Sequence, residues 1–249
     1  MCGKFTAMFS WRTLHGLYAG LGLDDPELAG GPAGEGGGGE DRIETLMPMR
    51  PAPILTLDAA GRRAIVPMRW GLTPKWNAGP RGIIHARSET LDDKRHFKDA
   101  FASRRGLLVV KTFNEGKEVP SSRPGGRSKT QQFTITPKDG KPIGIAVIWE
   151  REAQPDGAEM LTFAMVTTPP NRLIATITDR MPAVLPREHW AKWLGEDPAT
   201  HDELKAMLTP YDDNGNWDMA PEQPPRPPRP PTPPRAPRVT DKPSQRDLF

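Results

Sequence analysis

The feature that most constrains the fold is a proline-rich segment at the C-terminal end of the sequence. From Pro221 to Phe249 it reads PEQPPRPPRPPTPPRAPRVTDKPSQRDLF and holds eleven of the 30 prolines. Proline fixes φ and lacks a backbone N–H, so such a segment favours an extended polyproline II conformation over a packed core. We therefore expect one folded domain over residues 1–220 and a disordered tail over residues 221–249.

The net charge of +3 resides on this tail. Removing the tail's six basic and three acidic residues from the totals of 34 and 31 leaves 28 of each in the body. A body that binds nucleic acid would then have to gather its basic residues on one face. No apolar run approaches the roughly 20 residues that span a bilayer, and the N-terminus lacks the pattern of a secretion signal. One cysteine excludes an intrachain disulfide and fits a reducing, cytoplasmic location.

The body is expected to be α+β, because runs of β type alternate irregularly with helical segments. The glycine-rich residues 30–40 predict a flexible loop. Hairpin turns are predicted at 58–61 and, as the strongest such signal, at 137–141 (PKDGK). The predicted strands are 53–57, 64–68, 106–113, 132–136, 143–149 and 161–168, and the predicted helices are 14–21, 88–101, 170–177, 186–194 and 199–208. We see no pairing element and expect a monomer.

Cys2 offers unusual chemistry if the initiator methionine is removed. An N-terminal α-amine has a pKa of about 7.7–8.0, so a useful fraction is neutral near physiological pH. That amine can attack an aldehyde to form a Schiff base. The adjacent thiol can then close a five-membered thiazolidine ring. An internal cysteine cannot do this, because its nitrogen is part of an amide.

Four blocks occur in a fixed order: MCGKF (1–5), RWGLTPKW (69–76), ARSET (86–90) and DRMP (179–182). They resemble the MCGRF, RWGLIPxW, NARxET and HxRMP-like blocks of the abasic-site-processing (SRAP) family. Pro48 with PAP (51–53), and Thr167-Thr168 with Asn171, resemble further family segments. The resemblance runs from Met1 to about Leu208. It implies a β-rich, barrel-like core with surrounding helices and a DNA channel beside the N-terminus.

The resemblance also implies a function. Members of this family link the N-terminal cysteine covalently to the ring-opened sugar of an abasic site in single-stranded DNA, and so shield the lesion during replication. The family has also been described as a peptidase, by analogy with processing of the initiator methionine. Carried over, Cys2 is the nucleophile. Glu115, in TFNE (112–115), falls at the family's FYEW-like glutamate and would position the amine and move protons. No cofactor and no metal are implied.

This sequence departs from the family pattern at three positions. His85 stands where the NARxET block has asparagine, and Thr178 where the family usually has histidine. That histidine is thought to help open the sugar ring, so its loss would slow trapping or hinder reversal. His85 can donate one hydrogen bond and titrate near neutrality, and one interpretation is that it takes over proton transfer. Gly116 replaces a tryptophan that follows the family's glutamate.

Single-stranded DNA binding needs cations for phosphates and flat apolar faces for bases. Basic residues in or beside the family-like blocks are predicted to bind phosphate, and two tryptophans to stack near the lesion. For Trp70, packing in the core is an equally favoured interpretation. The predicted DNA-binding residues are Lys4, Arg69, Trp70, Trp76, Arg87, Arg95 and Arg180.

The last five residues, QRDLF, resemble the QLxLF pentapeptide by which many bacterial proteins bind the sliding clamp. Leu248 and Phe249 would fill an apolar pocket while Gln245 forms hydrogen bonds at its edge. Alternatively, the tail is a linker with nonspecific affinity for nucleic acid. For the whole chain, two alternatives to the covalent shield also stay open. They are a noncovalent single-stranded DNA binder and a peptidase limited to self-processing.

Overall fold

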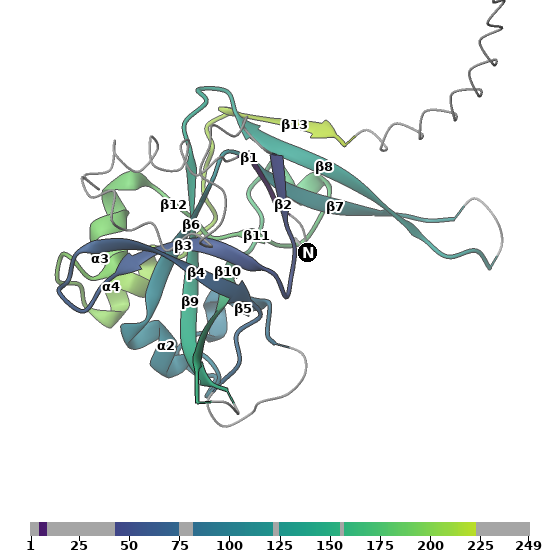
Figure 1. Ribbon diagram of the computed structural model, residues 1–249. Helices are drawn as coiled ribbons and strands as arrows, with labels where there is room; N and C mark the ends of the chain where they lie inside the picture. The colour runs from purple at the N-terminus through teal and green to yellow at the C-terminus, as the bar shows by residue number, and fades with distance from the viewer. Residues whose placement is uncertain (1–4, 9–42, 75–81, 122–124, 155–156, 223–249) are drawn as a thin grey trace, which may run out of the picture.

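A closed five-stranded barrel forms the core of the protein (Figure 1). The computed structural model describes residues 5–8, 43–74, 82–121, 125–154 and 157–222. Antiparallel pairing joins β4 to β3, β3 to β6, β6 to β9 and β9 to β10, and β10 returns to β4 through a short parallel contact. The barrel strands are β3 (Pro51–Leu57), β4 (Arg63–Trp70), β6 (Arg105–Val110), β9 (Ile143–Ala153) and β10 (Glu159–Thr168). The predicted α+β class with a barrel-like core is confirmed.

The burial of β9 and β10 explains why the sheet closes. Residues 143–150 are all buried, and so are residues 162–168, so neither strand alternates between core and solvent there. A strand buried on both faces needs neighbours at both edges to satisfy its backbone polar groups. Three short strands complete this sheet: β5 (His85–Arg87) and β11 (Met181–Pro182) pair with β10, and β12 (Val184–Leu185) pairs with β9.

Short helices gather on one side of the barrel (Figure 1). They are α2 (Lys98–Ser103), α3 (Trp190–Leu194) and α4 (His201–Ala206), with 3-10 turns η2 (Ser88–Thr90), η3 (Ile174–Thr176) and η4 (Arg187–His189). Thr200 and Glu203 form a reciprocal capping box at the start of α4, which satisfies its first N–H groups. The Trp193 Nε1 donates to the Gly106 carbonyl of β6 at 2.8 Å, which fixes α3 to the barrel.

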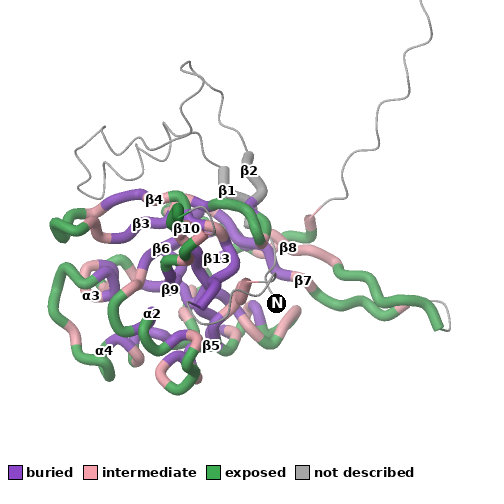
Figure 2. Tube along the Cα trace, turned by 60° about the horizontal axis from the view of Figure 1, so that its bottom comes forward, coloured by how far each residue is buried: buried purple, intermediate pink, exposed green. Residues whose placement is uncertain are grey.

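A second sheet projects from the body as a long hairpin. Strand β7 (Phe113–Val119) pairs with β8 (Lys129–Pro137), and β13 (Trp217–Pro221) pairs with the inner part of β8. Figures 1 and 2 show the outer half of β7 and β8 extending away from the barrel with exposed residues. A third, two-stranded sheet pairs β1 (Phe5–Met8) with β2 (Ile43–Leu46), and β1 lies against β7 and β6.

The predicted hairpin at 58–61 is confirmed, whereas the one at 137–141 is wrong. Asp58 Oδ1 accepts from the N–H groups of Ala60 and Arg62, and Leu57 pairs with Arg63. The turn at 137–141 does form, with Gly140 at φ +66°. However, β8 joins β7 and β13, while β9 joins β6, β10 and β12. Because β9 is buried on both faces, its partners come from the barrel and not from its neighbour in sequence.

The predicted helix over 88–101 is also largely wrong. The chain forms η2, then turns, and becomes α-helical only from Lys98 to Ser103. Side-chain contacts hold the segment in this path, since Glu89 pairs with Arg180 and Asp92 with Lys205. The predicted helix over 170–177 shortens to η3, and those over 186–194 and 199–208 are found with shorter bounds. The predicted helix at 14–21, the glycine-rich loop and the tail beyond 222 lie outside the described residues. Within the described part, no helix is long and apolar enough to cross a membrane.

Candidate functional site

An ion pair joins two of the family-like blocks. Arg180, of the DRMP block, donates to both carboxylate oxygens of Glu89, of the ARSET block, at 2.5 and 2.9 Å. This pair lowers the pKa of Glu89 to about 2. The Arg180 side chain is only 11% exposed. Arg180 therefore joins two segments that are 91 residues apart in the sequence. The sequence alone did not indicate this structural role.

The C-terminal end of β10 is the place where these segments meet. Arg180 Nη2 donates to the carbonyl and the hydroxyl of Thr167 at 2.7 and 3.2 Å. On the other edge of β10, Arg87 of β5 is the register partner of the same threonine. Arg87 is exposed, and within the described chain it forms no ion pair. Arg87 and Arg180 thus share Thr167 as a neighbour, but Arg180 is held by Glu89 and only Arg87 is exposed, so their predicted role in phosphate binding stays a prediction.

The segment between β10 and β11 carries Thr178, and hydrogen bonds of Asn171 hold its two ends together. The Asn171 N–H donates to Met181 Sδ at 3.1 Å, and its Oδ1 accepts from the Ile174 N–H at 2.9 Å. Thr178, half-buried, donates its N–H to the Ile174 carbonyl at 3.0 Å just after η3. This loop places Thr178 two residues before Arg180, close to the end of β10 where Arg180 contacts Thr167.

His85 opens β5 and is half-buried. Its register partner is Met165 of β10, and its ring lies 6.1 Å from that of Trp70 in an edge-on arrangement. Because side chains alternate along a strand, His85 and Arg87 share one face, while Ala86 between them is fully buried in the core. The two side chains therefore lie on the same face of β5, where Arg87 is exposed and the His85 ring packs against the buried Trp70.

Glu115 lies near the base of the β7–β8 hairpin and is 1% exposed. A buried carboxylate is costly unless charged or hydrogen-bonding groups compensate it. Two residues earlier, Phe113 packs edge-on against Trp217, which stacks on Tyr211. The Tyr211 carbonyl accepts from Asn171 Nδ2 at 2.9 Å. This chain of contacts connects the base of the hairpin to the loop that carries Thr178 and Arg180.

Cys2, Lys4 and Trp76 lie outside the described residues. The strand β1 begins three residues after Cys2, however, and it lies against β7, the strand that carries Glu115.

Three other predicted residues do not join this site. Arg69 pairs with Glu152 at 2.8 Å and is the register partner of Thr162, five residues before Thr167 on β10, which is roughly 16 Å along the strand. Trp70 is 0% exposed, stacks on Phe163, and donates its Nε1 to the Ile84 carbonyl at 2.8 Å. The structure thus favours the core-packing interpretation of Trp70, because a base cannot reach its faces.

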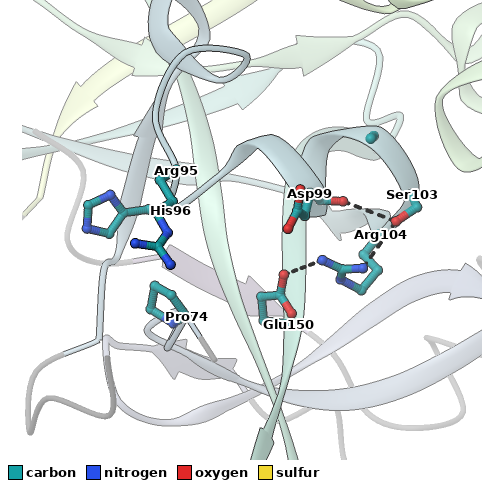
Figure 3. A pocket seen from close by; sticks show the side chains of 8 residues that line it. Pro74, Arg95, His96, Asp99, Ser103, Arg104 and Glu150 are labelled. Carbon is teal, nitrogen blue, oxygen red and sulfur yellow. Dashed lines mark hydrogen bonds and ion pairs between the residues drawn. The ribbon is translucent and has the colours of Figure 1, made fainter. Parts of the chain in front are cut away.

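Arg95 lies in a separate cavity of about 360 Å³ beside α2 (Figure 3). Its wall includes Glu150, which pairs with Arg104 and is the register partner of Thr162. The cavity is therefore at the end of β10 opposite to Thr167, and Arg95 does not gather with Arg87 and Arg180. Among the described residues, no group of three or more histidine, cysteine, aspartate or glutamate side chains is placed to hold a metal ion.

The family model described as SOS response associated peptidase (SRAP) matches residues 1–221. Curated relatives carry the name abasic site processing protein. YoqW of Bacillus subtilis is 32% identical over 149 residues, which cover 58% of this chain and 63% of the relative. YedK of Escherichia coli is 29% identical over 167 residues, covering 62% and 71%. The matched region thus spans less than two thirds of YoqW.

Solved structures share the fold. A protein from Bordetella bronchiseptica superposes with a TM-score of 0.67 at 20% identity, covering 89% of this chain and all of that chain. A phage-related protein from the same organism gives a TM-score of 0.63 at 21% identity, covering 89% of this chain and 94% of that chain.

Proposed function

Because this chain belongs to the SOS response associated peptidase (SRAP) family, we propose that it processes abasic sites in single-stranded DNA by trapping them on Cys2. The observation that carries the proposal is the position of Glu115, buried on the strand against which β1 lies. The names of the relatives, abasic site processing proteins, support DNA as the substrate. Removal of Met1 is the required first step.

The chemistry begins with the amine. The neutral α-amine of Cys2 attacks the aldehyde carbon of the ring-opened sugar, and the resulting carbinolamine loses water to give an imine. The thiol then adds to the imine carbon, and the nitrogen gains the thiol's proton, which closes the thiazolidine. Glu115 accepts a proton from the attacking amine and returns one to the departing hydroxyl. A general acid–base of this kind contributes about 10²–10⁴-fold in rate.

The substituted positions 85 and 178 take supporting roles in this proposal. His85 shares a strand face with Arg87, so it is suited to donate a hydrogen bond to the sugar and to move protons during ring opening. Thr178 offers a hydroxyl but no titratable group near neutrality. We therefore expect trapping that depends on His85, and slow reversal of the adduct.

The test of the Glu115 role is Glu115→Gln, with Glu118→Gln as the matched control. Glu118 lies three residues further along the same strand, is exposed, and is on the opposite face of the hairpin. Single-turnover crosslinking to a lesion-bearing oligonucleotide should slow by about 10²-fold or more in Glu115→Gln and stay unchanged in Glu118→Gln. Equal rates in both variants and the wild type, with both folded, would remove Glu115 from the mechanism.

A noncovalent single-stranded DNA binder is the second candidate, and the replacements at 85 and 178 are what favour it. In that case, DNA affinity would be the same in Cys2→Ala and no adduct would survive denaturation. The third candidate, a self-processing peptidase, predicts release of Met1 without any reaction with DNA. No Ser-His-Asp or Cys-His motif in the sequence supports a broader peptidase activity.

We also propose that the C-terminal QRDLF binds the bacterial sliding clamp. The support is the sequence alone: Leu248 and Phe249 are apolar residues at the end of a polar, proline-rich tail. The spacer from 223 to 244, which follows β13, would reach roughly 70 Å if extended. Such a tether would raise the concentration of the domain near single-stranded DNA at a replication fork.

A further inference from the structure

The outer half of the β7–β8 hairpin is a projecting arm with two distinct faces. From Lys117 outward, β8 pairs only with β7 within the described residues, because the third strand, β13, stops at Pro221 opposite Phe133 and Glu222 makes the last backbone bond, to Gln132. Figure 2 shows this arm as exposed on both strands, apart from the partly covered residues at its base. The outer arm contributes no side chain to the barrel core. Packing of the core therefore does not explain why the hairpin is this long or why it carries these charges.

The register assigns each side chain of the arm to a face. Directly paired residues of an antiparallel ladder share a face, and successive residues alternate. Glu115, Lys117 and Val119 therefore lie on the same face as their partners Phe133, Gln131 and Lys129. The opposite face holds Asn114 with Thr134, whose side chains form a 3.0 Å hydrogen bond, and Glu118 with Thr130. The candidate catalytic carboxylate thus shares its face with two lysines.

The charges of the arm are divided between these faces. Lys117 and Lys129 are exposed, and neither forms an ion pair with any described residue. The one acid of the described outer arm, Glu118, is on the other face and accepts a hydrogen bond from Ser128. Arg127 adds a further exposed cation just beyond Lys129. The face that continues outward from Glu115 is therefore purely cationic within the described residues.

Gly116 explains how the arm keeps this geometry. A Cβ at position 116 would lie 2.5 Å from the Thr130 Cγ2 and 3.0 Å from the Gln132 Nε2, on the face away from the lysines. A larger residue at position 116, such as the tryptophan in the family's motif, would require the Thr130 and Gln132 side chains to move. The replacement by glycine lets Thr130 and Gln132 close over β7.

We propose that the lysine-bearing face of this arm binds the sugar–phosphate backbone of the single strand that flanks the trapped lesion. This rests on the proposed function, since it takes single-stranded DNA as the ligand. At about 3.3 Å per residue, Lys117 lies about 7 Å and Lys129 about 13 Å beyond Glu115 along the hairpin. A strand leaving the lesion along this face meets both ammonium groups in turn. Val119, 44% exposed, and Gln131 supply the apolar and hydrogen-bonding surface between them.

The competing explanation is that the lysines only protect an exposed hairpin edge from pairing with other chains. In that case, neutralising them would lower solubility but leave DNA binding as in the wild type. The two explanations differ most for DNA that extends beyond the lesion, because only a flank of sufficient length can reach the arm.

The experiment compares the full chain with K117Q/K129Q and with the control K138Q/K141Q. The control removes the same charge from exposed lysines in the β8–β9 turn, and Lys138 lies nine residues, or about 30 Å, along the chain from Lys129. Affinity is measured for single-stranded oligonucleotides with an abasic site reduced to its unreactive alcohol. Short probes leave no more than one nucleotide on each side of the lesion, which is too short to span the roughly 13 Å to Lys129, and long probes leave about fifteen.

We expect K117Q/K129Q to bind the long probe about five- to tenfold more weakly at low salt, and to reduce the slope of log affinity against log salt by about 1.4. Its affinity for the short probe, and its crosslinking rate at saturating short reactive DNA, should equal those of the wild type. K117R/K129R should restore long-probe binding. An undiminished affinity for the long probe, or an equal loss on both probes, would overturn the proposal. Because the probe is unreactive, failure of covalent trapping would leave this result interpretable.

Discussion

At the scale of single residues, the Arg180–Glu89 pair positions the site. Arg180 is nearly buried and donates to both oxygens of Glu89 and to Thr167, so one side chain connects η2, β10 and the loop before β11. Glu89→Gln should destabilise the protein by about 1 kcal/mol at pH 7, since half of the Glu89 side chain is exposed and solvent screens the pair. A change of this size lowers Tm by about 2–4 °C.

The pH dependence of that effect has a definite sign. The pKa of Glu89 falls from its ordinary 4.5 to about 2 in the folded state, so its contribution to stability is full above pH 4.5 and is lost as pH falls toward 2. The Tm difference between wild type and Glu89→Gln should therefore shrink between pH 5 and pH 3. Glu159→Gln, at the exposed Arg151 pair, should show little difference at any pH. A constant difference down to pH 3 in Glu89→Gln would contradict this assignment.

Much of the site could be predicted at this scale, but not its pairing. Arg87 and Arg180, which belong to two of the family-like blocks, both neighbour Thr167 at the end of β10. The blocks did not separate these two from Arg69 and Arg95, which lie toward the other end of β10. A single sequence carries no signal for which of two distant charges meet. The role of Glu89 was likewise missed, although it lies inside the ARSET block.

At the scale of elements, strand β9 organises the barrel and limits what can pack beside it. A Cβ at Gly144 would lie 2.4 Å from the Trp190 ring of the segment that begins α3. Gly144→Ala should therefore destabilise the protein by about 1–3 kcal/mol through overpacking, seen as a lower midpoint in denaturant. In a Trp190→Phe background, which removes the atoms in contact, the same substitution should cost much less. Equal costs in both backgrounds would show that the clash is relieved elsewhere.

The elements themselves were predicted unevenly, and for a physical reason. The 58–61 hairpin and most predicted strands follow from local pattern and turn chemistry, and they were found, but the strand predicted over 106–113 ends at Val110 and Phe113 begins β7 in another sheet. The turn at 137–141 has equally good local chemistry, yet its strands belong to different sheets. Turn residues determine where the chain reverses, whereas burial on both faces of β9 determines which strands pair. Periodicity alone likewise failed for 88–101, where side-chain ion pairs hold a non-helical path.

At the scale of the whole molecule, the tail should act independently of the domain. Leu248→Ala/Phe249→Ala should abolish binding of the full chain to a bacterial sliding clamp, measured by surface plasmon resonance, because both apolar anchors are lost. The same variant should trap abasic sites at the wild-type rate when DNA is free in solution. Clamp binding that survives the double substitution would remove QRDLF as the contact and leave the tail as a linker.

The central claim is covalent trapping by Cys2, and a denaturing gel tests it most directly. Wild-type protein and Cys2→Ala, each with removal of Met1 verified by mass spectrometry, are incubated with single-stranded DNA that carries one abasic site. We predict a shifted band that survives denaturation in the wild type and is absent from Cys2→Ala. No shifted band from fully processed wild type, or an equal band from Cys2→Ala, would contradict the claim.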